Sequence, residues 1–273
     1  MGKILGAGIS PHPPIILPEI GRGREGEVQE TIDGLKKLAK KIRDKKPDTL
    51  LFITPHGEAF QDAHSVLMEE ELQGDFSSFG EGDLKIEAEN DIFLGELILE
   101  NAIANRVPLI PIGERKPSHQ FTGKLDWGVL VPLYYIQKEY TCPILSISYG
   151  YLDSGEMERL GETIYESIQE SDRRVFIVAS GDLSHALKDS GPYAYDEKGP
   201  AFDKEIRALF EKEDFKGILN FDKEISIPAK ECGLRTFQIL AGAIQNLKTK
   251  TEIYSYQGNF GVGYMTGFVD IEG

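Results

Sequence analysis

Short, almost uninterrupted apolar segments alternate along this chain with longer segments whose apolar residues recur at helical spacing. The apolar segments span residues 4–10, 49–54, 107–112, 143–148 and 174–180. Such runs are typical of strands buried on both faces, and strand–helix alternation is typical of α/β folds. The pattern predicts a single α/β domain over residues 1–273, a sandwich with a central, largely parallel or mixed sheet flanked by helices.

The helices are expected at residues 25–44, 91–105, 127–137, 155–170, around 202–210, and 233–246. In the first of these, Val28, Ile32, Leu35 and Ile42 form one apolar stripe, as in a helix with one buried face. Two further strands are expected at residues 251–256 and 264–271, whereas residues 63–89 look like inserted strands or loops.

Charge and cysteine content exclude several function classes. The chain carries 45 acidic and 30 basic residues, a net charge of −15, which argues against nucleic acid or an anionic membrane surface as a partner. Cys142 and Cys232 form no CxxC motif, so a reducing, cytoplasmic location is expected. The first 18 residues lack the features of a signal peptide, and no run reaches the ~18 apolar residues of a membrane span.

Four of the five histidines each follow a predicted strand: His12, His56, His119 and His185. In open α/β sheets, ligands bind beyond the carboxyl ends of the strands. If these strands are parallel, the four imidazoles converge on one edge of the sheet. One loop histidine is usually an ordinary hydrogen-bonded residue, but four in the same context indicate a site. His64 lies at a predicted strand start and is interpreted as structural.

Converging imidazoles indicate a metal site. The donor sets that histidines form in enzymes leave coordination positions open, so a catalytic site is expected. Two histidines and one carboxylate form the donor set of non-haem Fe(II) oxygenases, and a similar set can hold zinc with a site open for water. Glu231 is the candidate carboxylate because it directly precedes an apolar helix, from whose start it can reach inward. Cys232 is a rival donor beside it. The donor types alone do not select the metal.

Four segments carry a resemblance to a known family: SPHPPIILPEIG near the start, TPHG, ASGDLSHAL with GPYAYDEKGPAFDKEI, and ECGLRTFQILAGA near the end. In this order they resemble the catalytic subunit of class III extradiol ring-cleavage dioxygenases, the LigB-like superfamily. They are also similar to its Memo-like branch, which includes the AmmeMemoRadiSam-system proteins. The resemblance extends over essentially the whole chain.

The resemblance implies that His12, His56 and Glu231 hold Fe(II), with zinc or another divalent metal as alternatives. It implies that His185 is the active-site acid/base and that His119 binds substrate or supports the site. In the Memo-like branch a cysteine, here Cys232, takes the place of the carboxylate donor. The chain carries both residues, and Glu231 is the expected third metal ligand.

The implied activity is opening of a catechol-like or aminophenol-like ring with O2, on a small aromatic substrate, in a protein that can form homo-oligomers. Two alternatives stay open: a Memo-like metal-binding protein with a redox or partner-binding role, and a zinc hydrolase.

Asp182 is a candidate for orienting an imidazole. Arg235 can pair either with an anionic substrate or with a surface acid. The glycine-rich segment 258–263 reads as a turn between strands, not as a phosphate loop.

Overall fold

The computed structural model describes residues 1–113 and 123–272. Within them an eight-stranded sheet has the order β6-β3-β7-β2-β8-β1-β10-β9. Its strands are β1 (Lys3–Ser10), β2 (Thr49–Thr54), β3 (His64–Leu67), β6 (Leu109–Ile112), β7 (Ile144–Ser148), β8 (Arg174–Ser180), β9 (Thr249–Gln257) and β10 (Tyr264–Ile271). A separate hairpin is formed by β4 (Glu71–Phe76) and β5 (Glu81–Glu89).

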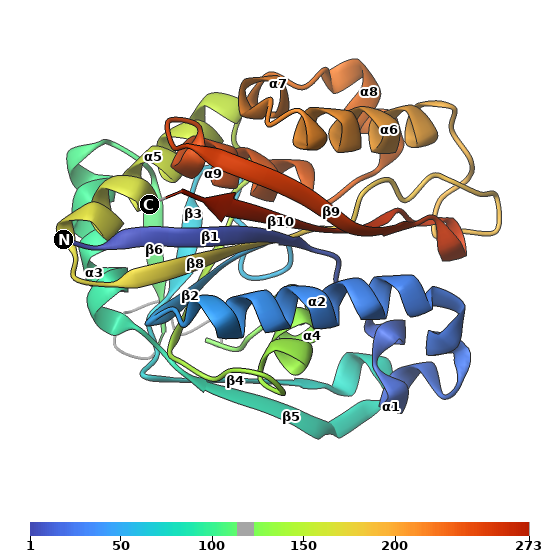
Figure 1. Ribbon diagram of the computed structural model, residues 1–273, viewed down its shortest axis with the longest axis horizontal. Helices are drawn as coiled ribbons and strands as arrows, with labels where there is room; N and C mark the ends of the chain where they lie inside the picture. Colours follow the sequence, from blue (N-terminus) through green and yellow to red (C-terminus); the bar gives the residue numbers. More distant parts are fainter. Residues whose placement is uncertain (114–122, 273) are drawn as a thin grey trace.

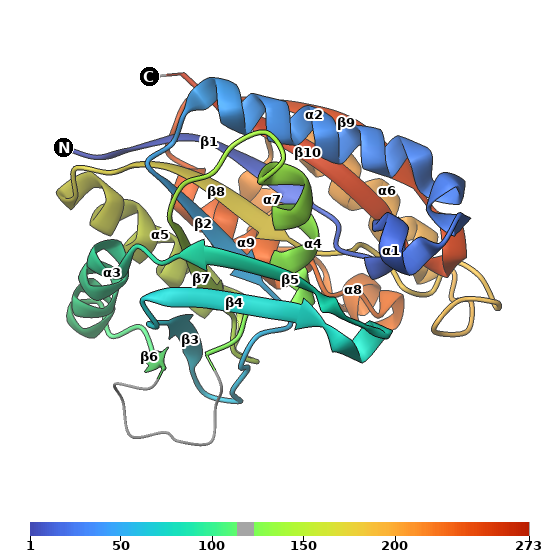
Figure 2. The ribbon, with the colours of Figure 1, turned by 90° about the horizontal axis from the view of Figure 1, so that it is seen from below.

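The helices of the described part are α1 (Pro18–Gly21), α2 (Gln29–Lys45), α3 (Ile92–Ala104), α4 (Trp127–Ile136), α5 (Ser154–Glu170), α6 (Lys198–Glu211), α7 (Phe215–Leu219), α8 (Lys223–Ala229) and α9 (Leu234–Ile244). Helices α2 and α4 lie on the opposite side of the sheet from α5 and α9 (Figure 1). The β4–β5 hairpin lies on the α4 side (Figure 2).

Alternation along the strands builds two apolar layers, one on each face of the sheet. In β2, Leu51 and Ile53 face the helices α3, α5 and α9, whereas Leu50 and Phe52 face α2 and α4. All four side chains are at most 1% exposed. Burial on both faces is the physical reason why this strand is apolar at every position instead of at every second one.

Four central strands, β7, β2, β8 and β1, run parallel to one another. The prediction of a largely parallel or mixed sheet is confirmed as mixed, because β10 and β9 are antiparallel on one side and β3 is antiparallel to β7 on the other. Strand β6 pairs in parallel with β3 and therefore runs opposite to the central four. Its end does not share the edge at which β1, β2 and β8 end.

The predicted inserted region, residues 63–89, contains both an edge-region strand of the main sheet and the separate hairpin. Helices α7 and α8 were not anticipated, because each is shorter than the window over which helical periodicity is recognisable. None of the helices within the described ranges combines the length and apolar character needed to cross a lipid bilayer.

Candidate metal centre

Two histidines from separate strand ends face each other at the edge where the parallel strands end. His12 follows β1 and is 2% exposed, and His56 follows β2. Their Nε2 atoms are 3.0 Å apart, and the ring planes are nearly perpendicular. Because β1, β8 and β2 are neighbouring parallel strands, residues 44 positions apart are brought into contact. The predicted convergence is therefore observed for this pair.

The tautomer of His12 is fixed by a buried serine. Ser180, the last residue of β8, donates its hydroxyl hydrogen to the carbonyl oxygen of Gly128 at 2.5 Å. Its Oγ also lies 2.9 Å from His12 Nδ1 and has no second hydrogen to give, so Nδ1–H donates to it. The lone pair of His12 is therefore on Nε2, the atom that faces His56. An outer hydrogen bond of this kind is what orients metal-binding histidines.

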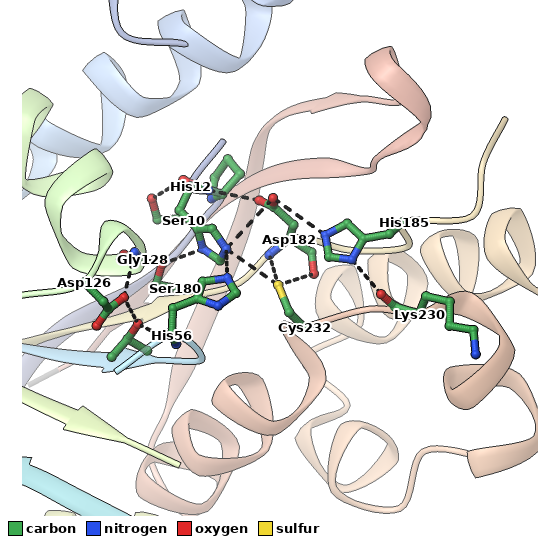
Figure 3. A network of polar contacts seen from close by, with 12 residues as sticks. Ser10, His12, His56, Asp126, Gly128, Ser180, Asp182, His185, Lys230 and Cys232 are labelled. Atoms are coloured by element: carbon green, nitrogen blue, oxygen red, sulfur yellow. Dashed lines mark hydrogen bonds and ion pairs between the residues drawn. The ribbon is translucent and has the colours of Figure 1, made fainter. Parts of the chain in front are cut away.

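The third donor beside this pair is a thiol. Cys232 Sγ lies 3.6 Å from His12 Nε2, and the donor atoms of His12, His56 and Cys232 all lie within 4.8 Å of one another. A divalent ion binds imidazole nitrogen at about 2.0–2.1 Å and thiolate sulfur at about 2.3 Å, which separates two nitrogens by about 3.0–3.4 Å and nitrogen from sulfur by about 3.1–3.6 Å. The distances from His12 Nε2 to His56 Nε2 and to Cys232 Sγ fit a single ion. Figure 3 shows the three side chains pointing toward one another.

Glu231, the carboxylate chosen from the sequence, lies outside this donor group. Its Oε2 accepts a hydrogen bond of 2.6 Å from the backbone N–H of Leu234, at the start of α9. The side chain is thus used to satisfy a free amide of the helix terminus. Burial raises the pKa of Glu231. The adjacent position, Cys232, is the one directed at His12.

Asp182 and His185 form a second pair beside the donors. Asp182 Oδ1 accepts from the backbone N–H of His12 at 2.9 Å, and its Oδ2 lies 3.9 Å from both His12 Nε2 and His185 Nε2. His185 Nδ1 donates to the carbonyl oxygen of Lys230 at 2.6 Å, since a carbonyl can only accept. The Nε2 atom of His185 is therefore the one left to exchange protons on the side of the donors (Figure 3).

The titration behaviour of these groups follows from burial and from Asp182. Burial lowers the pKa of His12, and burial with the neighbouring His12 lowers that of His56 to about 3, so both imidazoles are neutral near pH 7. For His185, burial by itself lowers the pKa, but the neighbouring Asp182 carboxylate outweighs it and raises the pKa above 6.5. Burial raises the pKa of the Cys232 thiol. A bound divalent cation reverses that tendency, because it deprotonates a coordinating thiol.

A cleft of about 470 Å³ opens beside His56, between the β4–β5 hairpin and the start of α4. The Trp127 indole stacks on the His56 ring with centroids 4.1 Å apart, and Phe79 meets Trp127 edge-on at 5.7 Å. Asp126 accepts from Thr54 Oγ1 and from the Gly128 N–H, both at 2.7 Å, and burial raises its pKa to about 6. His56 is therefore fixed by an aromatic stack on the side of this cleft.

Two side chains that support the candidate site, Ser180 and Asp203, were not assigned this role from the sequence. Ser180 is a polar residue at the end of an otherwise apolar strand, and that position was a usable signal. Asp203 interrupts the apolar stripe of α6 and is 1% exposed; it accepts from the Ser184 N–H at 2.8 Å and from Tyr256 Oη at 2.7 Å, so it braces the loop that carries His185. His119 lies outside the described residues. His64 is fully buried and accepts from the Gly150 N–H, which fits its structural interpretation.

Comparison with known sequences identifies relatives over most of the chain. The family model described as the catalytic LigB subunit of aromatic ring-opening dioxygenase matches residues 6–267. Protein CA_C1420 of Clostridium acetobutylicum is 37% identical over 256 residues, which cover 93% of this chain but 55% of that protein. The chain thus spans about half the length of this relative. The 3,4-dihydroxyphenylacetate 2,3-dioxygenase of Escherichia coli is 28% identical over 81% of this chain and 82% of its own.

Two further comparisons agree. The 2-aminophenol 1,6-dioxygenase beta subunit of a Pseudomonas species is 27% identical over 67% of this chain and 63% of its own length. The crystal structure of the uncharacterised protein JW3007 of Escherichia coli K12 has a TM-score of 0.63 over 97% of this chain and 99% of that chain, at 13% identity, which shows a shared fold. From the match over residues 6–267, the chain belongs to the family of catalytic LigB subunits of aromatic ring-opening dioxygenases.

Proposed function

We propose that this protein is a metal-dependent dioxygenase that opens a catechol-like or aminophenol-like ring with O2. The observation that carries the proposal is the pair of neutral imidazoles, His12 and His56, with Nε2 atoms 3.0 Å apart and the Asp182–His185 pair alongside. The names of two relatives, which specify a dihydroxyphenyl and an aminophenol substrate, support the same substrate class.

We propose Fe(II) as the metal, held by His12, His56 and Cys232, with Glu231 supporting the helix beside them. An Fe(II) ion bound there would supply Lewis-acid activation of a ring hydroxyl and redox access to dioxygen. Both histidines offer neutral nitrogen lone pairs near pH 7, as metal binding requires. The thiol must lose its proton when it binds, and this makes affinity rise with pH.

His185 is the proposed acid/base. Its Nδ1 is committed to the Lys230 carbonyl, so Nε2 accepts the proton of the substrate hydroxyl and later returns a proton to the product. Asp182 holds this imidazole and stabilises its protonated form, because its carboxylate lies 3.9 Å from Nε2. General acid/base groups of this type contribute about 10²–10⁴-fold to rate. His119 is proposed to bind substrate.

The experiment is anaerobic reconstitution of the full chain with one equivalent of Fe(II), followed by oxygen uptake with a panel of catechols and aminophenols. We expect uptake to be matched by the absorbance of a yellow ring-opened product. His185→Ala should retain bound iron and lose turnover, and His119→Ala should raise KM. If the protein binds iron but consumes no oxygen with any of these compounds, the proposed dioxygenase activity is refuted.

One observation favours a second candidate, a metal-binding redox protein without ring cleavage. A thiolate is a softer donor than a carboxylate and suits copper(I) or zinc as well as iron. Parallel titrations with Cu(I), Zn(II) and Fe(II) decide between them: copper binding much tighter than iron, together with absent oxygen uptake, supports the second candidate. A zinc-loaded protein that hydrolyses esters would instead indicate the hydrolase.

A further inference from the structure

Arg235 lies in the first turn of α9, and no carboxylate of the described residues forms an ion pair with its guanidinium. Its guanidinium carbon is 5.6 Å from the ring centroid of Tyr149 and 5.8 Å from that of Tyr151. Within residues 1–113 and 123–272, no ion pair or hydrogen bond of this side chain is present. The side chain is half-buried between the two rings. Five N–H donors that are partly withdrawn from water and lack an acceptor indicate a place for an oxyanion.

Arg235 lines a cleft of about 380 Å³ between α8, α9 and the loop that follows β7. Two more cations, Lys223 and Lys230, line the same cleft, and Gln238 lies one turn further along α9. Neither lysine has an ion pair in the described part of the chain. A protein with a net charge of −15 thus gathers three unpaired cations around one cavity of small-molecule size.

Two acids also line the cleft, but both are committed to backbone amides. Asp153 Oδ1 accepts from the Glu156 N–H at 3.1 Å as the N-cap of α5. Glu231 Oε2 accepts from the Leu234 N–H at 2.6 Å. Both carboxylates keep their negative charge, and the charge of Glu231 interacts with Arg235, but the three cations outnumber the two acids that line the cleft.

The cleft is continuous with the segment that carries the metal donor. Lys230 and Glu231 immediately precede Cys232, and the Lys230 carbonyl holds His185 (Figure 3). Tyr149, which covers Arg235, donates through its hydroxyl to the Cys232 carbonyl at 3.4 Å. An occupant of the cleft therefore contacts the segment that carries Cys232 and holds His185.

We propose that this cleft binds the anionic group, carboxylate or phosphoryl, of a small molecule, and that Arg235 is the residue that recognises it. A planar guanidinium forms two parallel hydrogen bonds to such a group, which gives both affinity and orientation. If the ring-opening function proposed above holds, the site assigns an anionic substituent to the substrate; the binding site itself does not depend on that function.

Binding is tested by calorimetric titration of the full chain, without added metal, using phenylacetate, inorganic phosphate and the neutral analogue phenylacetamide. We expect at least one anion to bind, phenylacetamide to bind at least tenfold more weakly than phenylacetate, and Arg235→Gln to weaken anion binding roughly 10- to 100-fold. The stronger of the two anions identifies the group. Arg159→Gln, which removes an arginine paired with Glu156 on α5, is the matched control and should leave anion binding unchanged.

Two further variants keep the test valid if Arg235→Gln does not fold. Arg235→Lys keeps the positive charge, and Lys223→Gln alters an exposed side chain. Both should weaken anion binding less than Arg235→Gln. Absence of binding by both anions, or equal affinity in the wild type and Arg235→Gln, would overturn the proposal. With iron loaded, the ratio of kcat/KM for 3,4-dihydroxyphenylacetate over 4-methylcatechol should fall in Arg235→Gln. If neither catechol is opened, the ring-opening function fails while calorimetry still decides the anion site.

Discussion

Replacing Ser180 by alanine tests how the metal donors are oriented. Ser180 is fully buried, accepts from His12 Nδ1–H at 2.9 Å and donates to the Gly128 carbonyl at 2.5 Å. Without the hydroxyl, the N–H of His12 and the carbonyl of Gly128 both lose a partner in the interior. His12 can then adopt the other tautomer, in which Nε2 carries hydrogen and cannot bind a metal.

Two magnitudes follow from this geometry. Leaving a buried polar group unpaired costs about 1–3 kcal/mol, and the substitution leaves two such groups, so Ser180→Ala should lower the free energy of unfolding by about 2–6 kcal/mol. Loss of an outer hydrogen bond to a metal-binding histidine lowers metal affinity about 10- to 100-fold. Since tenfold corresponds to about 1.4 kcal/mol, the affinity loss equals about 1.4–2.7 kcal/mol.

The assay is a chelator-competition titration of metal affinity combined with urea denaturation of the metal-free protein. Ser171→Ala is the matched control, because Ser171 is 3% exposed and its Oγ also makes two hydrogen bonds, to Ile168 and Arg173, away from the donors. We expect both variants to lose stability and only Ser180→Ala to lose metal affinity. Equal metal affinity in Ser180→Ala and the wild type would refute the proposed orientation of His12.

Three further perturbations separate structural from metal-binding roles. Cys232→Ala should lose metal affinity in the same competition assay, whereas Glu231→Ala should keep it and lose about 0.5–2 kcal/mol of stability from the helix start; the opposite pattern would restore Glu231 as the donor. Asp203→Ala should lower the unfolding free energy by about 2–4 kcal/mol in urea denaturation, because the Ser184 N–H and the Tyr256 hydroxyl lose their acceptor, and Asp203→Asn should recover part of it. Burial lowers the pKa of His64 from 6.5 to about 4, so between these pH values the unfolded chain binds a proton that the folded chain does not, and stability falls on acidification by up to about 1.4 kcal/mol per pH unit. The unfolding free energy of His64→Gln should show a shallower slope over this window, and an unchanged slope would exclude His64 as the cause.

Most of the fold was predictable because each central strand is buried on both faces. A strand buried on both faces needs apolar residues at consecutive positions, and such a run is visible in the sequence. Strands β2 and β8 have the predicted bounds. Strand direction at the sheet edge was not predictable. Strand β6 has four residues, and their sequence does not show whether the strand runs in the direction of the central strands or against it. In the structure it pairs in parallel with β3 and so runs against them.

The candidate site was predictable only in part, for a related reason. His12 and His56 were found because the ends of parallel strands must meet at one edge. The choice between Glu231 and Cys232 depended on side-chain direction at a helix start, which adjacent sequence positions do not encode. In the structure the Leu234 amide takes the carboxylate, and the thiol turns toward His12.

The order of residues along the chain by itself determined the α/β class, the strand ends and the histidines placed there, since these depend on local burial and periodicity. Only the tertiary structure decided which side chain lies beside the two imidazoles, which serine fixes the tautomer of His12, and that Arg235 forms no ion pair in the described part. Those outcomes depend on distances of a few ångströms between residues far apart in sequence, and such distances are set by the packing of the whole sheet and its helices.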